Sequence, residues 1–194
     1  VLPASAGATD WQELSPGVRM RLISSDVVGP DGKTLLGLEL DMPQTTKTYW
    51  KVPGEAGIAA ELDLAGSAGL EGAAIRWPYP TIDQSAGVTD FVYFGPVVLP
   101  IALAVTGRPA LAKVSVTLGI CSQLCLPAQA AFLLPLSFDA PDRGQGLRLA
   151  QAMAQVPVAW AGPAPAFSAV TWTEDGKALA LLPNDPAIDP ASII

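Results

Sequence analysis

The two cysteines of the chain, Cys121 and Cys125, lie four positions apart in the stretch GICSQLCLP. Strand-like runs flank the three residues between them, so the pair is expected across the end of a β-hairpin. Facing residues of antiparallel strands have Cα atoms about 4.5 to 5.5 Å apart, which a disulfide can span. The sequence therefore predicts that the two thiols can bond without rearrangement.

The cysteine pair has two interpretations on these residues alone. As a structural staple it would be weak, because a closed loop of five residues contributes about 2 kcal/mol, against about 4.7 kcal/mol for a loop of a hundred. As a redox pair, one thiol would attack a partner's disulfide and the other would resolve the mixed disulfide. The short loop favours exchange without excluding the staple.

No activating charge lies near the pair along the sequence. The nearest basic residue is Lys113, and the neighbours Leu124 and Leu126 are apolar. Reactive thiolates are usually stabilised by a neighbouring positive charge or a helix N-terminus. We therefore expect guarded thiols that are activated by a partner, or by a carboxylate or amine that the fold brings in. Pro127 has no amide hydrogen, so it is expected to keep the chain after Cys125 at an accessible edge.

Composition excludes several kinds of site. The chain has no histidine, which removes the commonest general base and metal ligand, and two cysteines alone cannot build a zinc site. Its net charge of -7, without runs of lysine or arginine, argues against nucleic acids and anionic membranes as partners. No apolar run approaches the roughly 18 residues of a membrane span. We expect no cofactor, no metal and no membrane insertion.

Short strand candidates follow one another from about residue 17 to residue 138. Examples are VRMRLISSD (18 to 26), TLLGLELDM (34 to 42) and LAKVSVTLGIC (111 to 121), separated by turns rich in glycine and proline. Alternating strands at this spacing are typical of an antiparallel sandwich or barrel. No helical apolar stripe appears before residue 141, so the fold class is all-β.

A single short helix is predicted within residues 139 to 157. Asp142 can cap its N-terminus and Pro157 ends the segment. The residues expected to share its apolar face are Leu147, Ala150 and Ala154.

A second hairpin is predicted from residue 167 to residue 182. Apolar residues alternate on both sides of Asp175-Gly176, a strong turn signal. A two-stranded hairpin is only marginally stable alone, so this one either packs on the first domain or opens a second β domain. The expected organisation is a tail at 1–16, a β-sandwich domain at 17–140, a helix and linker at 141–166, and a hairpin and tail at 167–194.

Three stretches carry a family resemblance: TKTYWKVPGEAG (46 to 57), IRWPYPTIDQSAGVTDFVYFGPVVLPIAL (75 to 103) and CSQLCLPAQAAFLLPL (121 to 136). Their order and spacing resemble the N-terminal periplasmic (alpha) domain of the thiol:disulfide interchange protein DsbD, and more closely that of its ScsB-like relatives. The resemblance implies an immunoglobulin-like β-sandwich in the periplasm. The small-residue opening VLPASAGATDW, typical of a chain just after signal-peptide cleavage, agrees with export.

The resemblance also implies site residues. Cys121 and Cys125 match the family's redox pair, with Cys125 as the thiol that forms the mixed disulfide. The family shields its pair with an aromatic cap loop. The residues that match this loop and its surroundings are Asp90, Phe91, Tyr93, Phe94 and Gly95. Pro96 departs from the polar residue expected after the glycine, and Asp90 is the nearest candidate for the carboxylate that tunes the thiols in the family.

The function that the resemblance implies is a protein-disulfide reductase. Electrons would come from a membrane-embedded redox domain through a thioredoxin-like carrier and pass to oxidised periplasmic proteins. The alternative is a non-catalytic exported β-sandwich that binds or scaffolds a protein and uses the bridge as a staple. Copper handling through the thiols is suggested only by the habits of ScsB-like relatives.

The remaining aromatic and basic residues receive structural interpretations. Packing in the core or on a sheet face is expected for Tyr49, Trp50, Trp77 and Tyr79. Ordinary surface positions are expected for Lys47, Lys51 and Arg76.

Overall fold

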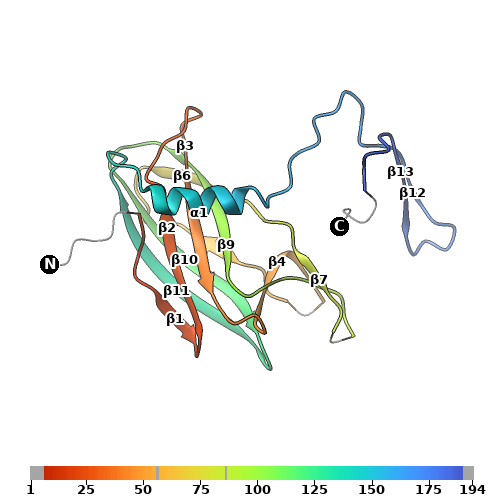
Figure 1. Cartoon of the computed structure of the whole chain (residues 1–194), viewed down its shortest axis with the longest axis horizontal. Coiled ribbons are helices and arrows are strands. Elements are labelled where there is room, and N and C mark those ends of the chain that lie inside the picture. The colour runs from red at the N-terminus through yellow and green to blue at the C-terminus, as the bar shows by residue number, and fades with distance from the viewer. Residues whose placement is uncertain (1–6, 56, 86, 190–194) are drawn as a thin grey trace. The chain divides into compact units, whose positions relative to one another are not determined.

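Antiparallel strands account for most of the residues that the computed structural model describes, which are 7–55, 57–85 and 87–189. Up to residue 157 the strands form two sheets, and Figure 1 shows a short helix lying across one of them. A separate two-stranded sheet follows in the sequence. The predicted immunoglobulin-like β-sandwich is confirmed. Within the described ranges, no helix is long and apolar enough to cross a membrane.

The first sheet has the strand order β1-β2-β3-β9-β6 among the described residues. Its strands are β1 (Gln12–Ser15), β2 (Val18–Ser24), β3 (Lys33–Asp41), β6 (Leu70–Ile75) and β9 (Val97–Val105). All of their pairings are antiparallel.

The second sheet has the order β11-β10-β4-β8-β7, and β5 also pairs with β10. Its strands are β4 (Lys47–Gly54), β5 (Glu61–Asp63), β7 (Thr81–Asp83), β8 (Asp90–Phe94), β10 (Ala110–Cys121) and β11 (Cys125–Leu136). The ladder between β4 and β10 has one paired position, Lys47 opposite Cys121, in the part of the chain that is described. Beyond it the strands separate, and the segment from Ile58 to β5 lies against β10, where the Gly119 amide donates to the Ile58 carbonyl at 3.0 Å.

The core forms where the alternating apolar residues of the two sheets face each other. Along β10, Val114, Val116 and Leu118 are buried, whereas Lys113 and Ser115 between them are exposed. Successive side chains of a strand point to opposite faces, which explains the alternation. Each fully buried Val or Leu contributes roughly 1.5–3 kcal/mol relative to an exposed position, so the alternation selects this packing.

The predicted helix is present as α1 (Arg143–Met153), but its buried face differs from the expected one. Asp142 caps it, because its Oδ1 accepts a hydrogen bond from the Gln145 amide at 3.0 Å. The buried residues are Leu149 and Ala152, and Leu147 is 63% exposed. The prediction of a face built on Leu147, Ala150 and Ala154 was therefore wrong, since Ala150 and Ala154 are exposed as well.

Packing against the first sheet sets the orientation of this helix. Leu149 joins Ile23 in a small buried cluster, and Leu35 and Val98 pack against it. Gly37 of β3 makes room, since a Cβ there would lie 2.8 Å from the Leu149 side chain. The helix thus covers the sheet face that points away from the sandwich core (Figure 1).

Two compact units divide the chain, with the boundary between Pro157 and Val158. In the second unit, β12 (Phe167–Trp172) and β13 (Leu179–Pro183) form the predicted antiparallel hairpin. Gly176 in its turn has a φ of +67°, which glycine adopts without strain. The domain boundaries expected from the sequence, and a second β domain opening at residue 167, stay predictions.

Candidate active site

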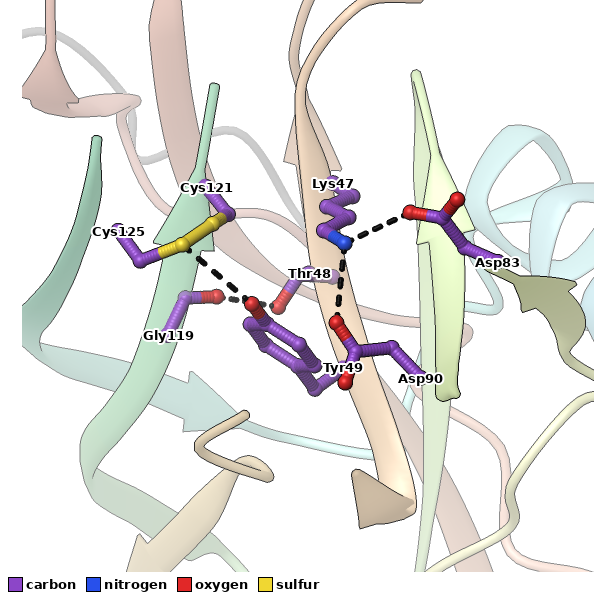
Figure 2. The surroundings of a disulfide bond; sticks show 8 residues. All are labelled: Lys47, Thr48, Tyr49, Asp83, Asp90, Gly119, Cys121 and Cys125. Carbon is purple, nitrogen blue, oxygen red and sulfur yellow. Dashed lines mark hydrogen bonds and ion pairs between the residues drawn. A yellow bond between two sulfur atoms is a disulfide. The ribbon is translucent and has the colours of Figure 1, made fainter. Parts of the chain in front are cut away.

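The two cysteines lie opposite each other at the end of a long hairpin. Strands β10 and β11 pair without a break from Ala110 opposite Leu136 to Cys121 opposite Cys125. The two cysteines form a disulfide, as Figure 2 shows. The position predicted from the flanking strands, across a three-residue loop, is confirmed.

The two cysteines differ in exposure. Cys121 is only 5% exposed and clusters with Tyr49 and Val92 on the outer face of the second sheet. Cys125, the first residue of β11, is exposed. A disulfide is opened by attack on one of its sulfurs, and access decides which one. The geometry therefore offers Cys125 to an incoming thiolate and leaves Cys121 as the inner sulfur.

Tyr49 contacts the outer sulfur. Its hydroxyl lies 3.6 Å from Cys125 Sγ (Figure 2), and it is the donor because a disulfide sulfur carries no hydrogen. The ring is 1% exposed and lies against Gly119, where a Cβ would approach it to 3.0 Å. Burial raises the pKa of Tyr49, and the charge of Lys47 opposes this rise only in part. The hydroxyl is therefore protonated at neutral pH. The packing expected of Tyr49 is present, but its contact with sulfur was not foreseen.

A row of four residues crosses the sheet at the level of the disulfide. Lys47 of β4 faces Cys121, and Phe94 of β8 faces Lys47 on the other side. Facing residues of paired strands place their side chains on the same face of a sheet. Cys125, Cys121, Lys47 and Phe94 thus share the outer face.

Lys47 is the centre of a buried charge cluster with Asp83 and Asp90. Its Nζ donates to Asp83 Oδ2 at 2.7 Å and to Asp90 Oδ2 at 3.1 Å (Figure 2). The side chains of Lys47, Asp83 and Asp90 are 13%, 10% and 4% exposed. Lys47 is therefore not the ordinary surface charge that was expected, and it lies opposite Cys121 on the neighbouring strand.

The charges of this cluster stabilise one another. Burial works against the charged form of Lys47, but hydrogen bonds and charges from Asp83 and Asp90 outweigh it and raise the pKa of Lys47. The hydrogen bond from Lys47, helped by the Ser85 amide, lowers the pKa of Asp83 to about 2. Lys47 is thus a cation and Asp83 an anion at neutral pH.

Asp90 has one oxygen in the ion pair and one without a partner. The residue is 3% exposed, and its Oδ1 is buried with no hydrogen-bond partner among the described residues. Gly54 lies against this carboxylate, since a Cβ there would come within 2.8 Å of Oδ1. A buried oxygen without a partner carries a desolvation cost, so the position of Asp90 is imposed by the fold.

The segment expected to form an aromatic cap is strand β8 and the turn after it. Phe94 is 39% exposed and lies in the same row as the cysteines. Tyr93 points to the other face, where it is 7% exposed and donates from its hydroxyl to the Pro78 carbonyl at 2.7 Å. The alternation of a strand explains why the two neighbours separate. Shielding of the thiols by Phe94 stays a prediction.

The other members of this segment also divide between the two faces. Phe91 lies 5.8 Å from the ring of Trp50, which packs against the main core. Gly95 follows the strand with a φ of +68° and donates from its amide to the Thr46 carbonyl at 3.1 Å. Of the five residues matched to the cap and its surroundings, Asp90 and Phe94 are therefore the ones placed on the face of the cysteines.

Metal ligation has no visible basis in the described part of the chain. His, Cys, Asp and Glu side chains do not gather there in groups of three or more that could hold an ion.

An immunoglobulin-like sandwich that carries a disulfide across a hairpin end, with one cysteine exposed and the other buried, defines a class of protein module for thiol:disulfide interchange. The family profile described as "Thiol:disulfide interchange protein DsbD, N-terminal" matches residues 19–137, and the chain belongs to this family. The match contains both cysteines and all three residues of the charge cluster.

Among solved structures, the chain is similar to the N-terminal periplasmic domain of ScsB from Proteus mirabilis. The two share 27% sequence identity with a TM-score of 0.65. The similarity covers 86% of this chain and 64% of that one, so the chain spans less than two thirds of the length of its structural relative. No curated protein sequence matches the chain.

Proposed function

We propose that this chain is a periplasmic protein-disulfide reductase module. Cys121 and Cys125 receive two electrons from a thioredoxin-like protein or domain linked to a DsbD- or ScsB-type membrane domain. They pass these electrons to the disulfides of oxidised periplasmic proteins. The electrons reside in the thiols themselves, so the step needs no other cofactor. The periplasmic setting is supported by the matched domain, which is periplasmic.

The reaction consists of two exchanges. In the first, the Cys125 thiolate attacks one sulfur of the partner's disulfide, forming a mixed disulfide and releasing one partner thiolate. In the second, the Cys121 thiolate attacks Cys125 Sγ, restores the Cys121–Cys125 disulfide and releases the other partner thiolate. Two electrons have then moved to the partner, and a reduced donor reverses the sequence to recharge the module.

The observation that carries this proposal is the difference in exposure within one disulfide. A structural staple has no need of an accessible sulfur, whereas exchange requires one sulfur to be reached and the other to stay close by as the resolving group. Cys125 is exposed, and Cys121 is 5% exposed and directly opposite it. These positions support Cys125 as the thiol of the mixed disulfide and Cys121 as the resolving thiol.

Trapping of the mixed disulfide tests the assignment. The variant Cys121→Ser is expected to accumulate a covalent complex with an oxidised thioredoxin-like protein. The complex should be visible on a non-reducing gel and should disappear after treatment with dithiothreitol. The matched variant Cys125→Ser is expected to trap several-fold less complex, because its remaining thiol is buried. Equal trapping by both variants would reject the assignment.

The redox potential of the pair separates exchange from a staple. Structural disulfides usually lie below about -300 mV and resist reduction by thiol pools. Equilibration of the chain with mixtures of reduced and oxidised glutathione is therefore expected to give a potential above that value. A potential far below it, with no trapped complex, would leave the pair as a structural bridge.

A further inference from the structure

We propose that Lys47 is a positioning residue for the exchange reaction, whose ammonium group moves from Asp83 and Asp90 toward Cys121 when that sulfur becomes a thiolate. The inference rests on the proposed thiol–disulfide exchange and adds a residue to it. It assigns the charge cluster a role that depends on the redox state of the pair.

The register brings Lys47 to the right place. Lys47 and Cys121 face each other on paired strands, and their side chains share the outer face of the sheet. Cβ atoms of such pairs are about 4.5–5.5 Å apart. A lysine ammonium is carried on a flexible four-carbon stem, so it can exchange one neighbour for another without backbone movement. Lys47 therefore has Asp83 and Asp90 on one side and Cys121 on the other.

The surroundings of Cys121 create the need for a counter-charge. The sulfur is nearly buried, in a cluster with Tyr49 and Val92. Burial destabilises a thiolate, because the charge loses its hydration, unless an opposite charge or a hydrogen-bond donor stabilises it. The Tyr49 hydroxyl lies at the other sulfur, at 3.6 Å from Cys125. Lys47 is the cation that faces Cys121 across the paired strands.

The present partners of Lys47 allow it to be shared. One ammonium donates to two aspartates, at 2.7 Å and 3.1 Å, so its hydrogen bonds are divided between two acceptors. The groups that face the ammonium are Asp83 from β7, Asp90 from β8 and the Tyr49 ring, whose centroid is 5.8 Å away. A new anion at Cys121 would compete with the two carboxylates for the same cation.

The step that Lys47 would assist is the opening of the disulfide by an incoming thiolate. The thiolate forms a bond to Cys125 Sγ, the Cys121–Cys125 bond breaks, and its electron pair stays on Cys121 Sγ as a thiolate. No proton moves in this step. A leaving thiol that is more stable as a thiolate departs faster, so a nearby ammonium accelerates the opening.

The test measures how readily Cys121 becomes a thiolate. In the full chain carrying Cys125→Ser, the rate of alkylation of Cys121 by iodoacetamide is followed against pH. Lys47→Met is expected to move the midpoint of this profile upward by about one pH unit, as loss of a neighbouring opposite charge does. Lys47→Arg, which keeps the charge, is expected to restore most of the shift.

Lys51→Met is the matched control. Lys51 lies on the same strand and is exposed, with its Nζ 4.7 Å from the Trp50 ring centroid. The substitution removes the same charge but is expected to leave the alkylation profile of Cys121 unchanged. An equal shift in the Lys47 and Lys51 variants would mean that overall charge alone is responsible, which would overturn the inference.

A second variant keeps the test informative if Lys47→Met does not fold. The triple variant Lys47→Met, Asp83→Asn, Asp90→Asn removes the whole cluster and leaves no buried charge without a partner. Its alkylation profile is compared with that of Asp83→Asn, Asp90→Asn, which keeps Lys47. The midpoint is expected to be higher in the triple variant, because only the double variant has an ammonium to stabilise the Cys121 thiolate. Equal midpoints in the two variants would contradict the inference.

The native disulfide supplies the second readout. Its reduction by dithiothreitol at neutral pH is expected to be several-fold slower in Lys47→Met than in the unsubstituted chain, and near normal in Lys47→Arg. If the alkylation profiles and reduction rates of folded Lys47→Met equal those of the Lys51→Met control, the inference is wrong. Failure of the chain to exchange with thioredoxin-like proteins would instead reject the proposed function, because alkylation involves no protein partner.

Discussion

At the scale of single residues, the site combines two cysteines of unequal exposure with a cluster of one lysine and two aspartates. The position of Cys121 and Cys125 could be predicted, because pairing across a three-residue loop is a local property of the sequence. Lys47 and Asp83 could not be predicted as neighbours, since 36 residues separate them and only the order of the strands brings them together. Asp90 was singled out by family resemblance, without a partner.

Acid titration should reveal the ion pair of Asp83. Its pKa is lowered to about 2 in the folded chain, mainly by the hydrogen bond from Lys47, so folding favours its ionised form. The resulting stabilisation is complete above the ordinary carboxyl pKa and is lost as the pH falls from about 4 through about 2. We expect the free energy of unfolding, measured with urea, to drop more steeply in this window for the unsubstituted chain than for Asp83→Asn.

The size of this difference is expected to be of the order of 1 kcal/mol. Asp31→Asn is a suitable control, because its ion pair with Lys33 is 3.6 Å long and both side chains are more than half exposed. This variant should follow the unsubstituted chain across the whole window. Parallel curves for Asp83→Asn and the unsubstituted chain would show that the pair with Lys47 does not contribute to folding.

At the scale of secondary-structure elements, alternation located most strands, but it did not say which strands would be neighbours. The long run that became β10 was readable because hydrophobic and polar residues alternate along it. The face of α1 was misjudged because several rotations of a short helix bury alanine and leucine equally well. The contact of Leu149 with the first sheet, next to Gly37, selects one of them.

Gly54, the last residue of β4, lies next to the charge cluster and should be intolerant of substitution. Gly54 has a φ of +94°, and a Cβ there would overlap the Thr89 carbonyl and approach Asp90 Oδ1 to 2.8 Å. Gly54→Ala is therefore expected to cost more than the 1–3 kcal/mol of backbone strain alone, in urea unfolding at neutral pH.

The control for this substitution is Gly32→Ala. Gly32 has a φ of +73°, but nothing lies within 4 Å of the Cβ that would be added. This variant should show the strain without the collision and lose less stability than Gly54→Ala. Equal losses in the two variants would mean that Asp90 and Thr89 can move away from the added Cβ without lowering the free energy of unfolding.

At the scale of the whole molecule, the first unit contains every residue that the proposed exchange uses. The members of the three buried clusters all precede Pro157, and so do both cysteines and the charge cluster. The family match, residues 19–137, lies entirely inside this unit. The immunoglobulin-like fold was accessible from the sequence through its family resemblance, whereas alternation alone left sandwich and barrel undecided.

Removal of residues 158–194 should therefore leave the first unit folded and active. The first unit is expected to unfold at nearly the same temperature in the truncated chain as in the full chain. Its disulfide should also be reduced by dithiothreitol at the same rate in both. Circular dichroism melting and a thiol assay measure the two quantities. Loss of the folded signal on truncation would show that the second unit contributes to the stability of the first.

The single paired position between β4 and β10 has a practical consequence for engineering. The sulfurs belong to the β10–β11 hairpin, whereas Lys47, Asp83 and Asp90 belong to β4, β7 and β8. Lys47 opposite Cys121 is the one rung of the described ladder that joins these two sets of strands. The charged residues and the cysteines thus come from separate segments of the sequence. The reactivity of the cysteine pair can therefore be adjusted by substitutions in β4, β7 and β8 that leave the β10–β11 hairpin unchanged.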